Sequence, residues 1–201
     1  MAGRIGGSSV TAHGAEERPR CVLMAGLPGS GKTTLARTLE DRGFVRLCPD
    51  EEMWRRHGVY GVDFPRGTFP TLEKPILEET IATLAELLRK GHDVVVDHGF
   101  WTPEDRSRWR TAALSAGAVP LLVYLEASHE ELWSRISKRN AKHEEDPNSI
   151  YFSESDLARY RTRFVPPGPD EDPTPYDGGP ECVLRLVAGA GRASAHQDRR
   201  C

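Results

Sequence analysis

The stretch Gly26-Leu27-Pro28-Gly29-Ser30-Gly31-Lys32-Thr33 decides the fold, because it matches the pattern G-x-x-x-x-G-K-[S/T] of a phosphate-binding loop (P-loop). The stretch follows a short apolar run and opens a segment of helical period. Glycines let the loop turn its backbone N–H groups toward phosphate oxygens, and the helix start adds the positive end of its dipole. This context makes a chance glycine-rich turn with a solvated lysine the weaker alternative, so the sequence predicts nucleotide binding.

Each position of the loop has an expected role. Lys32 is expected to reach the β- and γ-phosphates, and Thr33 to offer its hydroxyl to Mg²⁺. The expected nucleotide contacts are Gly26, Leu27, Pro28, Gly29, Ser30, Gly31, Lys32, Thr33 and Thr34. The predicted cofactors are therefore ATP and Mg²⁺, although the motif does not choose between ATP and GTP.

Short apolar runs alternate with longer segments of helical period along the rest of the chain. Such alternation predicts an α/β fold with a parallel sheet covered by helices on both faces. Helix ends are marked by glycines and helix starts by capping patterns such as Thr102-Pro103, Ser128-x-x-Glu131 and Ser153-x-x-Asp156. The predicted strands are Cys21–Ala25, Phe44–Leu47, Asp93–Val96, Val119–Leu125 and Cys182–Val187.

The composition fits one catalytic domain. A chain of 201 residues is long enough for one core, and we expect it over residues 19–188, with disordered ends at 1–18 and 189–201. The net charge of -3 does not favour nucleic acid as a partner. Four scattered cysteines and apolar runs too short for a bilayer predict a cytoplasmic protein without a membrane partner, whose oligomeric state stays open.

Two acids follow predicted strands at the sheet edge where ligands bind in parallel α/β folds. Asp97 ends the run Asp93-Val94-Val95-Val96-Asp97 and is expected to hold Mg²⁺, with acceptor binding as its alternative role. Asp50 is expected to take the proton from an acceptor hydroxyl, and its alternative role is that of a helix N-cap. His98 is interpreted as an ordinary loop histidine.

A basic pair lies on the helix expected over residues 130–139. Arg135 and Arg139 are four residues apart and therefore project from one face, where they could grip phosphoryl oxygens during transfer. A solvated stripe paired with Glu131 is the alternative. The polar stretch that follows predicts a mobile lid over about residues 139–153.

A second loop, from His57 to Pro70, is expected to cover the acceptor. Its surrounding aromatic side chains predict a pocket that binds the acceptor by stacking and burial. The same side chains are equally typical of an ordinary core. They are Trp54, Tyr60, Phe64 and Phe69.

These features occur in one order: the P-loop, Cys48-Pro49-Asp50, the stretch from Val94 through Asp97-His98-Gly99-Phe100-Trp101-Thr102-Pro103 to Arg106, and the arginine pair. In this order they resemble the small P-loop kinases (AAA_33-type ATP-binding proteins) grouped around polynucleotide 5′-hydroxyl kinase, chloramphenicol phosphotransferase and zeta-toxin-like enzymes. The resemblance covers about residues 20–165. It implies a sheet order 2-3-1-4-5, Asp50 as the base, and Arg135 with Arg139 as lid arginines.

One position departs from the polynucleotide kinases, which carry an arginine three residues after the catalytic acid. Met53 stands there, followed by Arg55 and Arg56, either of which would have to replace that arginine. The predicted activity is therefore transfer of the ATP γ-phosphate to a hydroxyl of a small molecule, with an antibiotic or a nucleoside as candidates. A polynucleotide 5′-hydroxyl kinase and a non-kinase ATP-binding switch remain the alternatives.

Overall fold

The computed structural model describes residues 18–59, 62–65, 67–141, 151–176 and 178–190. Strands and helices alternate along most of this chain, and a 3-10 turn at Pro169–Glu171 precedes the last strand. The strands are β1 Arg20–Ala25, β2 Val45–Leu47, β3 Val94–Val96, β4 Val119–Tyr124 and β5 Thr174–Pro175. The helices are α1 Lys32–Glu40, α2 Pro49–His57, α3 Phe69–Arg89, α4 Pro103–Ser115, α5 His129–Asn140, α6 Glu154–Arg163 and α7 Pro180–Ala190.

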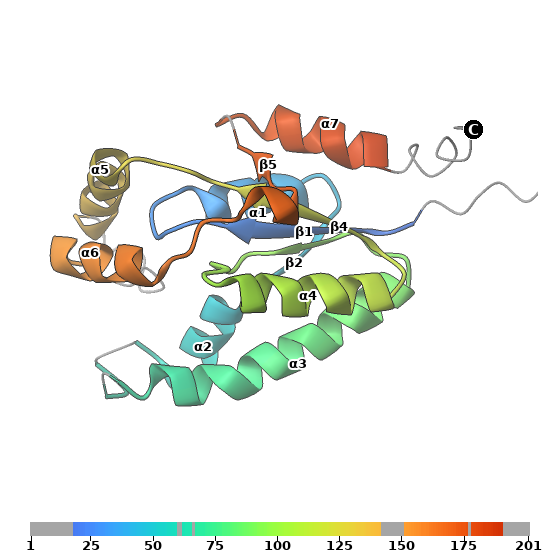
Figure 1. The fold of residues 1–201 in the computed structure, drawn as a ribbon. Helices are drawn as coiled ribbons and strands as arrows, with labels where there is room; N and C mark the ends of the chain where they lie inside the picture. Colours follow the sequence, from blue (N-terminus) through green and yellow to red (C-terminus); the bar gives the residue numbers. More distant parts are fainter. Residues whose placement is uncertain (1–17, 60–61, 66, 142–150, 177, 191–201) are drawn as a thin grey trace, which may run out of the picture.

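The five strands form one parallel sheet in the order β2-β3-β1-β4-β5, which confirms the predicted fold class and order. β1 lies in the middle and is buried from Cys21 to Ala25. Helices α1 and α7 cover one face of the sheet, and α3 and α4 cover the other (Figure 1). The P-loop leaves the carboxyl end of β1, where α2, α5 and α6 also gather (Figure 1).

The prediction of the fifth strand was wrong. Residues Cys182–Val187 belong to helix α7, and Val183 and Val187, four residues apart, point into the core as helical spacing requires. A short apolar run does not distinguish a buried strand from one face of a helix. The strand that completes the sheet is the two-residue β5, which pairs Thr174 with Val123.

The predicted helix starts are confirmed. Thr102 caps α4 by accepting a hydrogen bond from the backbone N–H of Asp105, and Ser128 and Ser153 form capping boxes on α5 and α6. The glycines that were expected to end helices adopt positive φ angles at Gly43, Gly91 and Gly117.

The predicted ends and lid lie largely outside the described residues. This applies to residues 1–17 and 191–201 and to 142–150 of the lid. Helix α7 continues to Ala190, two residues past the expected boundary of the domain at 188. Within the part that is described, no helix has the length and apolar character needed to cross a membrane.

Arg106 joins α4 to the segment that leads into β5. Its side chain is 2% exposed and forms a two-pronged ion pair with Glu171, at 2.6 and 2.7 Å. Its remaining nitrogen donates to the carbonyl oxygens of Phe100, at 3.2 Å, and Val165, at 2.9 Å. Four donor contacts therefore hold one buried charge.

Replacing Arg106 by methionine is expected to lower the free energy of unfolding by about 3 kcal/mol, because Glu171 and two carbonyl groups lose their partner. Urea denaturation measures the change. Arg108→Met on the exposed side of the same helix is the control and should change stability by less than about 0.5 kcal/mol. Equal effects of the two substitutions would contradict a special role for Arg106.

Candidate nucleotide and acceptor site

The P-loop has the conformation that its glycines predict. Gly29 and Gly31 adopt φ angles of 83° and 102°, and a Cβ at Gly29 would come within 3.0 Å of the Leu132 carbonyl oxygen. The Lys32 Nζ donates to the carbonyl oxygens of Gly26, at 2.9 Å, and Leu27, at 3.0 Å. These bonds hold the ammonium group within the turn of the loop.

The charge of Lys32 is set by its surroundings. Burial lowers its pKa to about 8, an effect that the carboxylates of Asp97 and Asp50 oppose and that Arg139 reinforces. Lys32 therefore stands between the two acids predicted from the strand ends and one of the predicted lid arginines. The structure brings these four side chains into one site.

Asp97 lies beside the P-loop, as expected for a residue that would hold a metal ion with Thr33. The Thr33 hydroxyl donates to Oδ1 of Asp97 at 3.3 Å, and Asp97 is only 4% exposed. A hydroxyl and a carboxylate oxygen at this separation are the hard oxygen donors that Mg²⁺ prefers. Thr33 and Asp97 therefore fit Mg²⁺.

Arg46 is a site residue that the sequence interpretation missed. It extends from β2 and binds Oδ2 of Asp97 through Nε, at 3.0 Å, and Nη2, at 2.6 Å, while the same guanidinium binds Glu51. The ion pair with Arg46 neutralises the Oδ2 side of Asp97, while Oδ1 faces Thr33. A charged residue in the middle of an apolar strand was the signal for it.

Asp50 does not cap α2. The N-cap is Cys48, and Asp50 is the second residue of the helix, with its side chain 55% exposed. Its Oδ1 lies 4.0 Å from Nδ1 of His98. The expected alternative role as an N-cap is therefore wrong, and more than half of the Asp50 side chain is accessible.

His98 and Glu73 join Asp50 in a cluster that the sequence interpretation did not predict. One ligand atom from each of the three side chains lies within 4.8 Å of the other two. Burial, Asp50 and Asp105 raise the pKa of Glu73 to about 7, and burial with the nearby Lys32 lowers the pKa of His98. No sequence pattern links Glu73, in the second turn of α3, with the ends of β2 and β3.

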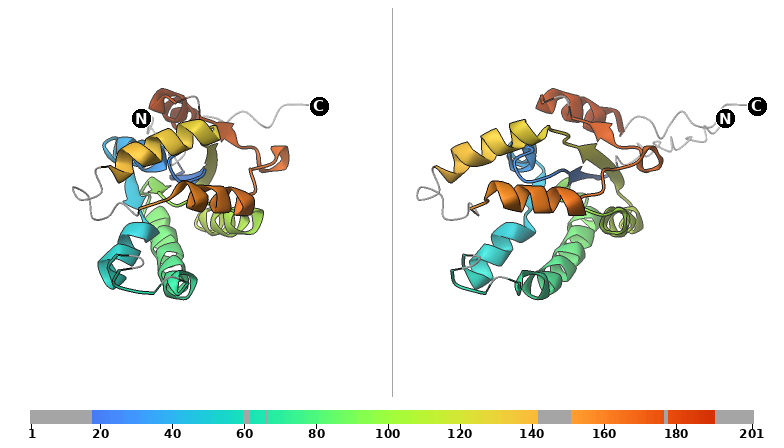
Figure 2. Two further views of the ribbon diagram at one scale, coloured as in Figure 1. Left: turned by 90° about the vertical axis from the view of Figure 1, so that its left-hand side faces the viewer. Right: turned by 60° about the vertical axis from the view of Figure 1, so that its left-hand side comes forward.

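The lid arginines lie on α5, which packs against the P-loop through Leu132 and Ile136. Nη1 of Arg135 is 3.3 Å from the carbonyl oxygen of Gly29 and donates to it. The guanidinium carbon of Arg139 lies 5.5 Å from the centre of the Phe152 ring at the start of the segment leading into α6. Figure 2 shows α5 and α6 side by side at the same end of the molecule.

The residues after Asp50 have structural roles. Met53 is 2% exposed and packs with Phe64 and Ile76, and Phe69 lies against the same cluster. Arg55 pairs with Glu52, whereas Arg56 pairs with Glu52 and Glu79. Phe64 and Phe69 therefore fill a small core between α2 and α3, while Tyr60 lies outside the described residues and Trp54 is 38% exposed.

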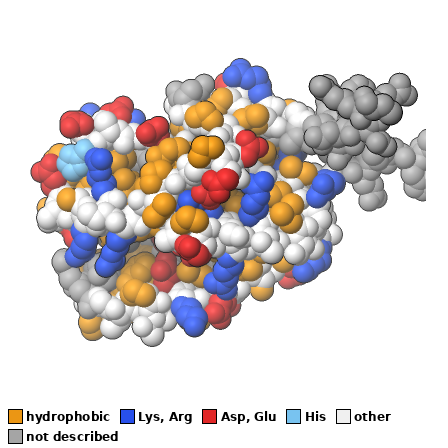
Figure 3. Space-filling model, in the orientation of Figure 1, with side chains coloured by type: hydrophobic (Ala, Val, Ile, Leu, Met, Phe, Trp, Pro, Cys, Tyr) orange, Lys and Arg blue, Asp and Glu red, His pale blue; other side chains and the backbone are white. Residues whose placement is uncertain are grey.

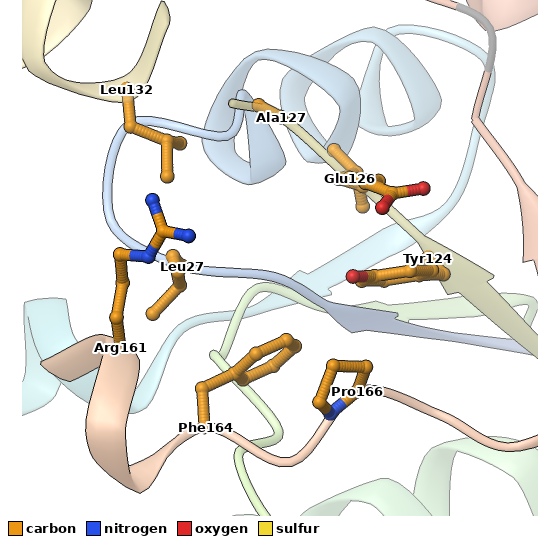
Figure 4. A pocket seen from close by; sticks show the side chains of 9 residues that line it. Leu27, Tyr124, Glu126, Ala127, Leu132, Arg161, Phe164 and Pro166 are labelled. Carbon is orange, nitrogen blue, oxygen red and sulfur yellow. The ribbon is translucent and has the colours of Figure 1, made fainter. Parts of the chain in front are cut away.

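A separate cavity of about 220 Å³ lies between the P-loop, the segment after β4 and the end of α6 (Figure 4). Most of its lining residues have apolar side chains, and the Arg161 guanidinium points into it across from Glu126 (Figure 4). Its lining residues are Leu27, Tyr124, Leu125, Glu126, Ala127, Leu132, Arg161, Phe164 and Pro166. This cavity does not contain Asp50 or Lys32 and is distinct from the acceptor side.

Comparison with known proteins places the fold among nucleotide-binding proteins. The family described as "AAA domain" (AAA_33) matches residues 21–167. A curated "Nucleotide-binding protein" from Syntrophotalea carbinolica (strain DSM 2380 / NBRC 103641 / GraBd1) is 35% identical over 96 residues, which cover 44% of this chain and 33% of that protein. The match therefore spans about a third of the length of the curated relative.

Three solved structures share the fold. A putative kinase from Chloroflexus aurantiacus J-10-fl has a TM-score of 0.67 at 22% identity, over 86% of this chain and 98% of that one. A chain of the Pnkp1/Rnl/Hen1 RNA repair complex has a TM-score of 0.59 at 22% identity, and the match covers 79% of this chain and 46% of that one. A gluconokinase from Sinorhizobium meliloti 1021 has a TM-score of 0.55 at 17% identity, and the match covers 89% of this chain and 95% of that one.

Proposed function

We propose that this chain, which belongs to the AAA domain family, is a kinase that transfers the γ-phosphate of ATP to a hydroxyl group of a small molecule. The observation that carries the proposal is the placement of Asp50. An accessible carboxylate that does not cap the helix lies close enough to the P-loop lysine to act on its charge. A protein that only bound nucleotide would need no base at this position.

The residues divide the reaction between them. Lys32 and the backbone N–H groups of the P-loop would bind the phosphates, and Arg135 with Arg139 would stabilise the charge on the transferring group. Thr33 and Asp97 would hold Mg²⁺, which neutralises phosphate charge when bound. Asp50 would accept the proton as the acceptor hydroxyl attacks.

A small-molecule acceptor fits the charges better than a polynucleotide does. Met53 is buried, and the arginines that follow it are paired with glutamates rather than left for phosphates. Basic and acidic side chains are interspersed over the face in Figure 3, without a continuous basic stripe. An antibiotic, as in self-resistance, or a nucleoside is a candidate acceptor, and we propose the cytoplasm as the location of a reaction that uses ATP.

A labelling screen tests the proposal. The protein with Mg²⁺ and γ-labelled ATP is offered neutral, cationic and anionic hydroxyl compounds, together with oligonucleotides that carry a 5′-hydroxyl. We expect transfer to a small compound, with an acceptor KM that changes less than about threefold between 50 and 200 mM salt, because few phosphate contacts are broken.

Two outcomes would contradict this proposal. Efficient labelling of oligonucleotides that falls steeply with salt would favour the polynucleotide kinase. ATP binding without transfer to any acceptor would favour the nucleotide-binding switch. A parallel measurement of ATP binding separates the second outcome from a protein that has simply lost its nucleotide site.

A further inference from the structure

We propose that the acceptor is a vicinal amino alcohol, in which Asp50, Glu73 and His98 bind the ammonium group while the neighbouring hydroxyl receives the phosphoryl group. This inference rests on the proposed kinase function and specifies its substrate class. It assigns Glu73 and His98 as specificity residues. The three side chains come from different elements: α2, α3 and the segment that follows β3.

The spacing of the three side chains fits an ammonium group. Their nearest ligand atoms lie within 4.8 Å of one another, and His98 Nδ1 is 4.0 Å from Asp50 Oδ1. Acceptor atoms that receive hydrogen bonds of about 2.9 Å from one tetrahedral nitrogen are about 4.7 Å apart. Ligands of Zn²⁺ or Mg²⁺, at about 2.1 Å from the ion, would be only about 3.0–3.5 Å apart. The 4.0 Å between His98 Nδ1 and Asp50 Oδ1 is wider than the separation of two ligands on one such metal ion, which favours a hydrogen-bonded cation.

The three side chains of the cluster offer hydrogen-bond acceptors to a ligand. Two carboxyl groups offer oxygens, and the imidazole of His98 offers Nδ1, which accepts a hydrogen bond in the tautomer that carries its proton on Nε2. That Nδ1 is buried and has no hydrogen-bond partner among the described residues. An ammonium group has three donors and no acceptor, so it complements the cluster.

No lysine or arginine among the described residues forms an ion pair with the carboxyl groups of this cluster. The Glu73 side chain forms no hydrogen bond or ion pair within the described part of the chain, and the one ion-pair contact of Asp50 there is His98, which is charged only if protonated. The charged or titratable groups that face Glu73 are Asp50, His98 and Asp105, and none of these is a permanent cation. Lys32 acts on Asp50 from the phosphate side. A cationic ligand would supply the missing charge.

Both groups of an amino alcohol can use Asp50, because a carboxylate has two oxygens. One oxygen would accept from the ammonium group, and the other would take the proton of the hydroxyl. In the transfer, the hydroxyl oxygen forms a bond to the γ-phosphorus, the bond from that phosphorus to the β,γ-bridging oxygen breaks, and its electron pair leaves on ADP. The proton passes to Asp50. An amine on the carbon next to the hydroxyl allows both contacts at once.

A binding experiment tests the inference without turnover. The Glu73 carboxyl is titrated by carbon-13 NMR of glutamate-labelled protein with an ATP analogue that cannot be cleaved, in 2-amino-1,3-propanediol or in glycerol. We expect the amine to lower the pKa of Glu73 from about 7 by at least one unit and glycerol to leave it unchanged, because a bound cation favours the carboxylate. Equal effects of the two compounds, or none from the amine, would overturn the proposal.

Phosphoryl transfer supplies the second measurement. At pH 8, where Glu73 is ionised, we expect kcat/KM for 2-amino-1,3-propanediol to exceed that for glycerol at least tenfold, and Glu73→Gln to remove the preference by raising KM for the amine. Glu78→Gln, on an exposed side of the same helix, is the matched control and should keep it. Transfer to neutral acceptors alone would overturn this inference but leave the kinase intact, whereas no transfer to any hydroxyl compound would overturn both.

Discussion

Replacing Lys32 by alanine is expected to lower kcat for phosphoryl transfer at least about a thousandfold while the fold stays intact. The Lys32 ammonium is the charge that we propose binds the β- and γ-phosphates, and burial makes a substitute from solvent ineffective. Its contacts in the structure are two carbonyl oxygens of the loop itself, so the core does not depend on it.

Three measurements separate the effect on chemistry from an effect on folding. Turnover, ATP affinity and thermal unfolding are compared between the wild type and Lys32→Ala. Lys90→Ala serves as the control, because Lys90 is an exposed lysine paired with Glu86 at the end of α3. We expect it to retain full activity. Near-normal turnover of Lys32→Ala would remove the P-loop from the mechanism.

Most of the sheet could be predicted from the sequence because each of its first four strands is an apolar run next to a strong punctuation signal. β1 runs into the P-loop, and glycines close the helices before β2, β3 and β4. β5 has only two residues, including Pro175, and so carries no apolar pattern at all. The apolar run in α7 was therefore mistaken for it, since such a run fits one face of a helix as well as it fits a strand.

The residues of the candidate site were also only partly predictable from the sequence. The P-loop and Asp97 are visible because motif and strand end coincide, and the structure brings Thr33 and Asp97 within a hydrogen bond. Glu73 is invisible to that reasoning, and the charge of Arg46 within an apolar strand does not reveal its partners, since both roles depend on which side chains face them in the folded protein. A long-range pairing between single charged residues leaves no periodic trace in one sequence.

The absence of an arginine at position 53 has a physical explanation in the structure. α2 turns that position inward, where Met53 packs with Phe64 and Ile76, and an arginine there would need a buried partner. The helix instead presents Asp50 to the acceptor side from its first turn. The same helix therefore carries a core residue and the proposed base three positions apart.

Replacing Asp50 by asparagine is expected to lower kcat about a hundredfold or more and to leave ATP affinity nearly unchanged. Asparagine keeps the size of the side chain, and stability should hold because Asp50 neither caps α2 nor lies in the core. The substitution removes the group that we propose accepts the proton from the attacking hydroxyl. The loss should therefore appear in kcat, measured with an acceptor from the labelling screen.

Glu52→Gln is the matched control for this prediction, because it removes one negative charge from the same helix at a residue that pairs with Arg55 and Arg56 rather than facing His98. If the general charge of α2 were what mattered, both variants would lose activity together. If Asp50 acts as the base, Glu52→Gln keeps its turnover and Asp50→Asn loses it at equal ATP affinity. Full activity of Asp50→Asn would assign proton removal to another group. His98, whose Nδ1 lies 4.0 Å from Asp50 Oδ1, would then be the next residue to substitute.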